Sequence, residues 1–142
     1  MAEMNPYQTT AVKTATPVEL VLMVYDECIN SLRNAEEAFK IEGPERIEQI
    51  GNSLLHAQDA ITELSLSLDM EQGGEISENL SRLYDFMTHH LSEANIKKEI
   101  KPVQEVRGMM QGLRDTWAEV AKQVGGQHAP DAPRSGRISI AG

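Results

Sequence analysis

The chain has 142 residues, of which 40% are hydrophobic but only 4% aromatic, and its formal net charge is −9. This length is enough to close a single hydrophobic core. The negative charge argues against a nucleic-acid partner and against docking on an anionic membrane surface, because both need clustered Lys and Arg.

The N-terminal segment, residues 1–15, is polar with a few apolar side chains, among them Tyr7. It lacks the basic-then-apolar layout of a secretory signal. No apolar run in the chain approaches the roughly 18 residues of a membrane span. We therefore expect a cytoplasmic protein without membrane insertion.

The first helix is expected over residues 16–42. Thr16 and Glu19 form a capping box, with proline at the first helical position. Gly43 and Pro44 then stop the helix. Its apolar stripe recurs in steps of three and four, as Val21, Tyr25, Cys28, Leu32, Ala35 and Phe39. Cys28, the single cysteine, is expected to be a small buried hydrophobe rather than a reactive thiol.

Three more segments repeat this period, at residues 44–69, 75–95 and 102–124. Their stripes begin at Ile47, Ile76 and Val103. Short loops between helices of similar length make neighbours antiparallel. The sequence therefore predicts an all-α protein, an antiparallel up-and-down four-helix bundle.

The last segment, residues 125–142, is rich in Gly, Pro and Ala, and we expect a disordered tail there.

Several side chains lie off the core stripes and raise the question of what covers them. They are Leu20, Met23, Val24, Leu55, Thr62, Leu66 and Phe86. Leu55 and Leu66 are eleven residues apart and so share one face of their helix. One interpretation is that these are scattered surface residues, or core residues of an imperfect bundle. The other is a second apolar surface for an amphipathic partner segment, partly covered by the N-terminal segment with Tyr7 as a plug.

The sequence shows no pattern for catalysis or for a cofactor. No Glu is followed three residues later by His, as in di-metal bundles, and no Gly-rich phosphate loop or Cys/His metal spacing is present. A histidine phosphotransfer module, also a four-helix bundle, is the main alternative. His89 is its candidate, but Glu93 one turn later would repel an added phosphate. A generic helical adaptor stays open as a further alternative.

Five stretches together resemble a known family. They are NPYQ at 5–8, TATPVELVLMVYDE at 14–27, ELSLSLDMEQGGEISENLSRLYDFM at 63–87, LSEAN at 91–95 and LRDTW at 113–117. Over about residues 5–124 the chain is similar to the flagellin-specific secretion chaperones, the FliS family. It departs from the family pattern at Glu27-Cys28, where small residues are common, and the tail has no counterpart.

The resemblance implies a cytoplasmic helical bundle whose partner is the C-terminal segment of flagellin. It implies that the chaperone prevents premature polymerisation and keeps flagellin competent for flagellar type III export. A segment like that around Tyr7 is then expected to occupy part of the binding surface when flagellin is absent. A docking site on the flagellar export apparatus would be expected to be basic, given the charge of this chain.

Overall fold

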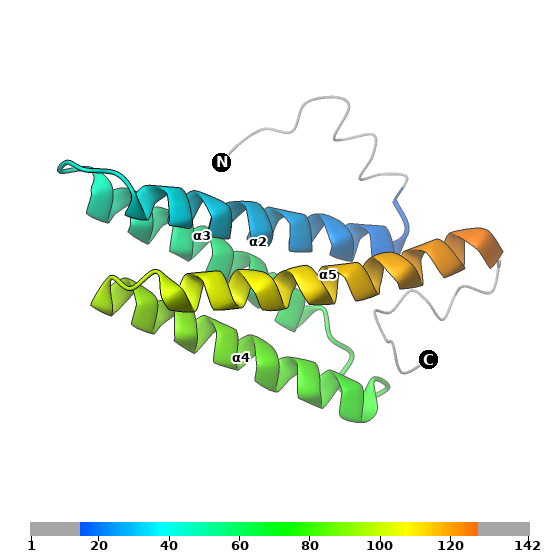
Figure 1. Cartoon of the computed structure of the whole chain (residues 1–142). Coiled ribbons are helices and arrows are strands. Elements are labelled where there is room, and N and C mark those ends of the chain that lie inside the picture. Colours follow the sequence, from blue (N-terminus) through cyan, green and yellow to red (C-terminus); the bar gives the residue numbers. More distant parts are fainter. Residues whose placement is uncertain (1–14, 128–142) are drawn as a thin grey trace.

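The structure, a computed structural model, describes residues 15–127 as four α-helices (Figure 1). These are α2 (Pro17–Phe39), α3 (Arg46–Leu66), α4 (Gly74–Lys97) and α5 (Lys101–Gln127). The N-terminal residues 1–14, with Tyr7, and the tail from residue 128 onward lie outside the described part of the chain.

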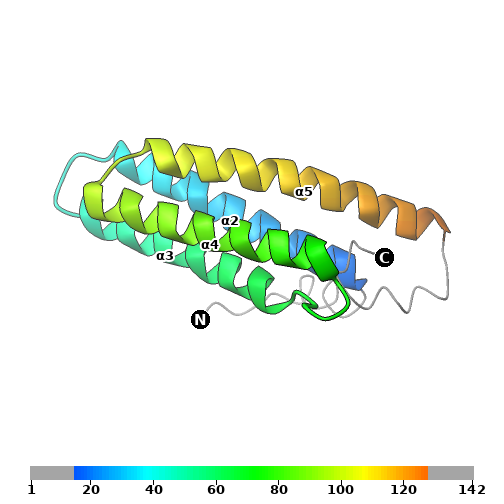
Figure 2. The same ribbon diagram turned by 90° about the horizontal axis from the view of Figure 1, so that it is seen from below.

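The helices form an antiparallel four-helix bundle, as the sequence predicts. α2 packs against α3 and α5, and α4 packs against the same two helices from the other side. Figure 2 shows α4 in front, with α3 and α5 on its two sides and α2 behind. Helix α5 continues to Gln127, so residues 125–127 are helical, where the sequence led us to expect the start of the tail.

The predicted capping box starts α2. The Glu19 amide donates to Oγ1 of Thr16 over 3.2 Å, and the Thr16 amide donates to the Glu19 carboxylate over 2.9 Å. These two bonds satisfy backbone donors that have no partner within the helix.

The end of α2 lies three residues before the expected position 42. The Arg46 guanidinium donates from Nε to the carbonyl oxygen of Phe39 over 3.2 Å and lies 5.5 Å from the centre of the Phe39 ring. A side chain from the first turn of α3 thus caps the last carbonyls of α2.

The connection between α3 and α4 requires both of its glycines. A Cβ at Gly73 would lie 2.5 Å from the carbonyl oxygen of Asp69 and 1.7 Å from Oγ of Ser77, and Gly74 has φ +57°. The Asp69 carboxylate accepts hydrogen bonds from the amides of residues 71 and 72, which closes the turn. The chain can therefore reverse tightly here only without side chains at 73 and 74.

The core consists of the apolar stripes of the four helices, and most predicted stripe residues are buried in it. Cys28 has no exposed surface, and its thiol donates to the carbonyl oxygen of Ala57 over 3.6 Å. Burial raises the pKa of the thiol to about 12, with a smaller contribution from the charge of Glu27. This confirms the prediction of an inert buried cysteine.

Two residues predicted to be on core stripes are exposed instead. Ile47 is 63% exposed and Ile76 is 38% exposed. Both lie in the first turn of their helices, at opposite ends of the bundle, where side chains are less covered than in its middle. Ile29 and Ala60, which the stripes omitted, are buried because α2 and α3 each contact two neighbours and so bury a wider face.

Three polar aromatic groups meet in the core and join α2, α4 and α5. The Trp117 indole donates from Nε1 to the Tyr25 hydroxyl over 3.0 Å, and the hydroxyls of Tyr25 and Tyr84 are 2.5 Å apart. All three side chains are at least 98% buried. Desolvation by burial raises the pKa of Tyr25 and of Tyr84, so both hydroxyls stay neutral.

Two ion pairs connect α2 to α5 on the outside of this core. Arg107 binds the Glu36 carboxylate with two guanidinium nitrogens, and Arg114 binds Asp26 with Nε to Oδ1 over 2.8 Å. These bonds raise the pKa of both arginines. The pairs lie about two turns apart on α5 and nearly three turns apart on α2, so together they define the antiparallel register of the two helices.

Replacing Tyr25 with Phe is expected to lower the free energy of unfolding by roughly 2–4 kcal/mol, because two buried groups, the Trp117 N–H and the Tyr84 hydroxyl, lose their partner. Tyr84→Phe removes only one bond and should cost about half as much. Urea unfolding followed by circular dichroism measures both. Equal losses for the two variants would contradict the central position of Tyr25.

Two glycine substitutions should have effects of opposite sign. Gly73→Ala is expected to cost about 2–3 kcal/mol, because its methyl group meets the backbone of Asp69. Gly108→Ala, in α5, should instead stabilise by about 0.5–1 kcal/mol, because an added Cβ there has no atom within 4 Å. Thermal midpoints of the two variants check this, and a tolerated Ala at 73 would refute the close approach.

Candidate partner-binding surface

The predicted surface residues within the described part of the chain are largely exposed. Exposed fractions are 37% for Leu20 and for Met23, 55% for Leu55, 81% for Leu66 and 49% for Phe86. Thr62 is also exposed, whereas Val24 is half-buried and packs against the core. Tyr7 lies outside the described residues. The exposed side chains are thus apolar surface that the described fold does not cover.

The side of α3 that faces α4 is marked by Gln58. Its Nε2 donates to the carbonyl oxygen of Thr88 and to Oγ of Ser92, both at 2.9 Å and both on α4. Leu55, Thr62 and Leu66 lie three residues before, four after and eight after Gln58. At 100° per residue they share its flank, turned outward to solvent.

Two isoleucines extend this row. Ile47 is eleven residues before Gln58 and so lies on the same flank of α3. Ile96, four residues after Ser92, lies on the flank of α4 that faces α3 and is 79% exposed. We call the surface formed by Ile47, Leu55, Thr62, Leu66 and Ile96 the α3–α4 face.

Sequence reasoning had not placed either isoleucine on a partner surface. Ile47 was assigned to the core stripe because it fits the period of α3. Ile96 belongs to no stripe, and that mismatch with the period of α4 is the signal that would have found it.

The three predicted residues at the start of α2 do not lie on the α3–α4 face. Leu20 and Val24 precede Cys28 by eight and four residues, and Cys28 contacts Ala57 of α3. They therefore lie on the flank of α2 that faces α3. Met23 is three residues from both Leu20 and Asp26, and the partner of Asp26, Arg114, is on α5, so Met23 lies between the two flanks on the outward side of α2.

Phe86 lies on a third side of the bundle. Its ring stacks on His90, with centroids 4.9 Å apart, and His90 Nε2 is 2.7 Å from the Glu105 carboxylate on α5. Phe86 is therefore on the flank of α4 that faces α5. The structure brings Leu55, Thr62 and Leu66 together and separates them from the other predicted residues.

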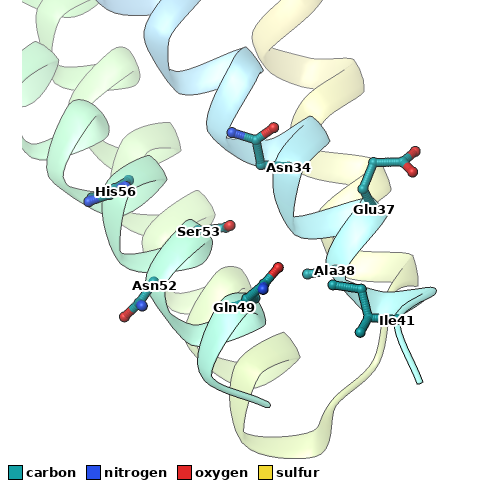
Figure 3. A pocket seen from close by; sticks show the side chains of 8 residues that line it. All are labelled: Asn34, Glu37, Ala38, Ile41, Gln49, Asn52, Ser53 and His56. Carbon is teal, nitrogen blue, oxygen red and sulfur yellow. The ribbon is translucent and has the colours of Figure 1, made fainter. Parts of the chain in front are cut away.

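A cavity of about 540 Å³ lies between the end of α2 and the start of α3 (Figure 3). Its lining is mostly polar: Asn34, Glu37, Ala38, Ile41, Gln49, Asn52, Ser53 and His56. None of the predicted residues within 15–127 lines it. It opens on the side of α3 toward α2, so it is distinct from the α3–α4 face.

The histidine pair of α4 has surroundings that disfavour phosphotransfer. The His89 side chain is 77% exposed, and its Nε2 lies 3.9 Å from the Glu93 carboxylate. A hydrogen bond from Lys97 and the charge of that lysine lower the pKa of Glu93, so the carboxylate stays charged beside His89. Its negative charge would oppose a phosphoryl group on this ring.

Within residues 15–127, no three His, Cys, Asp or Glu side chains are grouped so that they could hold a metal ion. Across the same residues, none of the helices is both long enough and apolar enough to cross a bilayer.

An all-α bundle with a row of exposed apolar side chains along one helix pair has the form of a helical protein-binding module. Comparison with known proteins gives the family. Residues 1–124 match the model for the flagellar protein FliS, and the chain belongs to this family. The resemblance seen in the sequence is therefore confirmed.

Relatives from several bacteria support this assignment. The chain is 37% identical over 122 residues to the flagellar secretion chaperone FliS of Bacillus subtilis, which covers 84% of this chain and 88% of that protein. It is 31% identical over 121 residues to the protein of the same name from Salmonella typhimurium, with 84% and 87% covered. The Escherichia coli protein is 32% identical over 111 residues, with 78% and 79% covered. Family membership supports an export chaperone role for the chain.

Proposed function

We propose that the chain is a cytoplasmic, non-enzymatic export chaperone that binds the C-terminal helical segment of flagellin. Binding prevents premature polymerisation and keeps flagellin competent for flagellar type III export. Two findings support this proposal: membership of the FliS family, and the exposed apolar row of the α3–α4 face. The exposure of Leu55 and Leu66 is the single observation that carries the site.

The mechanism follows from the chemistry of amphipathic helices. An amphipathic segment that is free in solution buries its apolar stripe against other copies of itself. A chaperone that covers this stripe blocks that association. Ordering a segment on binding costs roughly 2–5 kcal/mol, which the buried apolar contact must exceed.

The α3–α4 face is too small to be the whole contact. A stable interface buries about 800 Å² on each partner, more than the exposed parts of Ile47, Leu55, Leu66 and Ile96 supply. We therefore assign Leu20, Met23, Val24 and Phe86 to the rim of the same contact, where a long segment continues beyond this face.

Part of the apolar surface lies near the start of α2, the point where the N-terminal segment is attached. Leu20 is in the first turn of α2 and Leu66 is the last residue of α3, so both lie at one end of the antiparallel bundle. Residues 1–14 join the bundle at that end. Tyr7 is ten residues before Pro17 and can reach roughly 33 Å from it. We propose that Tyr7 covers part of the apolar surface until flagellin replaces it.

A capture experiment tests the proposed partner. The immobilised chain is expected to retain full-length flagellin and to lose most of it when the C-terminal helical segment of flagellin is deleted. Flagellin shortened at its N-terminus by the same number of residues is the control and should still be captured. Equal capture of the C-terminally shortened protein would rule out the proposed site.

The same assay tests the surface. Leu55→Glu and Leu66→Glu are each expected to weaken capture at least tenfold, because a carboxylate would be desolvated against the partner's apolar stripe. His56→Glu is the matched control, since His56 is exposed on the other flank of α3. All three are surface changes and should alter the free energy of unfolding by no more than about 0.5 kcal/mol. Normal capture by both leucine variants would place the surface elsewhere.

Deleting residues 2–13 tests the competition. If Tyr7 covers the surface in a fraction of molecules, its removal should raise the apparent affinity for flagellin by the inverse of the open fraction. Isothermal titration calorimetry of the full chain and of the shortened chain measures this change. Unchanged or weaker binding by a shortened chain that keeps its helicity would contradict the covering role.

A further inference from the structure

We propose that Gln58 sets the register of the partner helix on the α3–α4 face, by accepting a hydrogen bond through Oε1 from a polar side chain of that helix. The inference rests on the proposed function, in which the occupant is the C-terminal segment of flagellin in helical form. It assigns to one glutamine a role in specificity that the exposed leucines cannot fill.

The orientation of the Gln58 carboxamide is dictated by its partners. The carbonyl oxygen of Thr88 can only accept a hydrogen bond, so the amide nitrogen must face α4 and the oxygen must face away from it. Nε2 uses its two hydrogens on Thr88 and Ser92, both at 2.9 Å. The Gln58 side chain is thus held to α4 by two hydrogen bonds, with the acceptor Oε1 directed away from α4.

The acceptor is available at the surface. Oε1 of Gln58 accepts no hydrogen bond from any residue between 15 and 127, and within that range no buried side-chain nitrogen or oxygen lacks a partner. Since Gln58 is itself only partly buried, the described residues leave this oxygen open to solvent. Since Leu55 and Thr62 lie one turn to either side, a partner helix that covers Leu55 also covers this oxygen.

Covering the oxygen makes the partner's sequence matter. A buried acceptor without a donor loses its bond to water and weakens binding, by roughly tenfold for a neutral group. The backbone N–H groups within a helix are already bonded internally, so the donor has to be a side chain, such as that of Asn, Gln, Ser, Thr, Lys or Arg.

An apolar stripe alone defines its register poorly. A partner helix with apolar residues in steps of three and four can slide by one turn or one heptad and meet Leu55 and Leu66 again. One polar pair in an otherwise apolar contact removes this degeneracy, as a single buried Asn does in coiled coils. The donor should lie about three residues, or roughly 4.5 Å, along the partner from the residue that meets Leu55.

A double-mutant cycle with full-length flagellin tests the proposal. Each polar residue of the flagellin C-terminal segment is changed to Ala, and its dissociation constant is measured by calorimetry on the unchanged chain and on Gln58→Leu. We expect one flagellin position that weakens binding about tenfold on the unchanged chain and less than twofold on Gln58→Leu. Gln49→Leu is the matched control, a glutamine on the flank of α3 toward α2, and should leave that tenfold effect intact.

A second variant distinguishes the role of the outward acceptor Oε1 from that of the hydrogen bonds between Gln58 and α4. Ser92→Ala removes one inward bond of Gln58 and keeps Oε1, so the tenfold effect should persist. Loss of the tenfold effect in Ser92→Ala would overturn the role of Gln58, and so would the absence of any flagellin position coupled to Gln58. If capture still depends on Leu55 in that case, the proposed function stands and only the role of Gln58 falls. If the unchanged chain does not bind flagellin at all, the proposed function and this inference both fall.

Discussion

The packing of the bundle depends on a polar contact inside an apolar core. Tyr25 and Tyr84 come from α2 and α4, which face each other across the bundle, and Trp117 adds α5. Apolar side chains alone tolerate many small shifts of one helix along another. Hydroxyl and indole groups do not, because a shift of an ångström or two leaves a buried donor or acceptor without a partner.

Helix α3 is the helix that this aromatic contact does not include, and it is held differently. Its inner face carries Ala57 against Cys28, and its flank carries Gln58 against α4. With the core closed by the other stripes, the outward part of α3 has no structural task within the described fold. This explains why Leu55 and Leu66 can be exposed to solvent, at positions where a charged residue would not lower the stability of the fold. Because the fold does not require these leucines, their presence on the surface is informative about function.

Much of this architecture could be predicted from the sequence. The cap at Thr16, the glycine pair at 73 and 74 and the three-four periods are local signals, and local physics decides them. Ile47 and Ile76 are exposed although they fit the period, because a period gives a direction around one helix and contains no information on how well its first turn is covered.

The arrangement of the predicted site residues around the bundle could not be predicted, for a related reason. Periodicity shows that Leu20, Leu55 and Phe86 all point away from their own stripes. It does not show which helix lies on either side of each residue, so periodicity alone cannot tell which of them share a flank. Only contacts between helices, such as Gln58 with Ser92 and His90 with Glu105, assign a flank to a neighbour.

The chain has a single tryptophan, and its position has a practical consequence. Trp117 is 98% buried and bonded to Tyr25, on a different helix from those that form the α3–α4 face. Its emission spectrum reports the polarity of the interior and is shielded from whatever docks outside. A ligand that binds to the surface of the intact bundle should leave this emission unchanged. A ligand that separates the helices should shift the emission to longer wavelength. The fluorescence of Trp117 can therefore distinguish, without an added label, a ligand that docks on the surface from one that rearranges the helices.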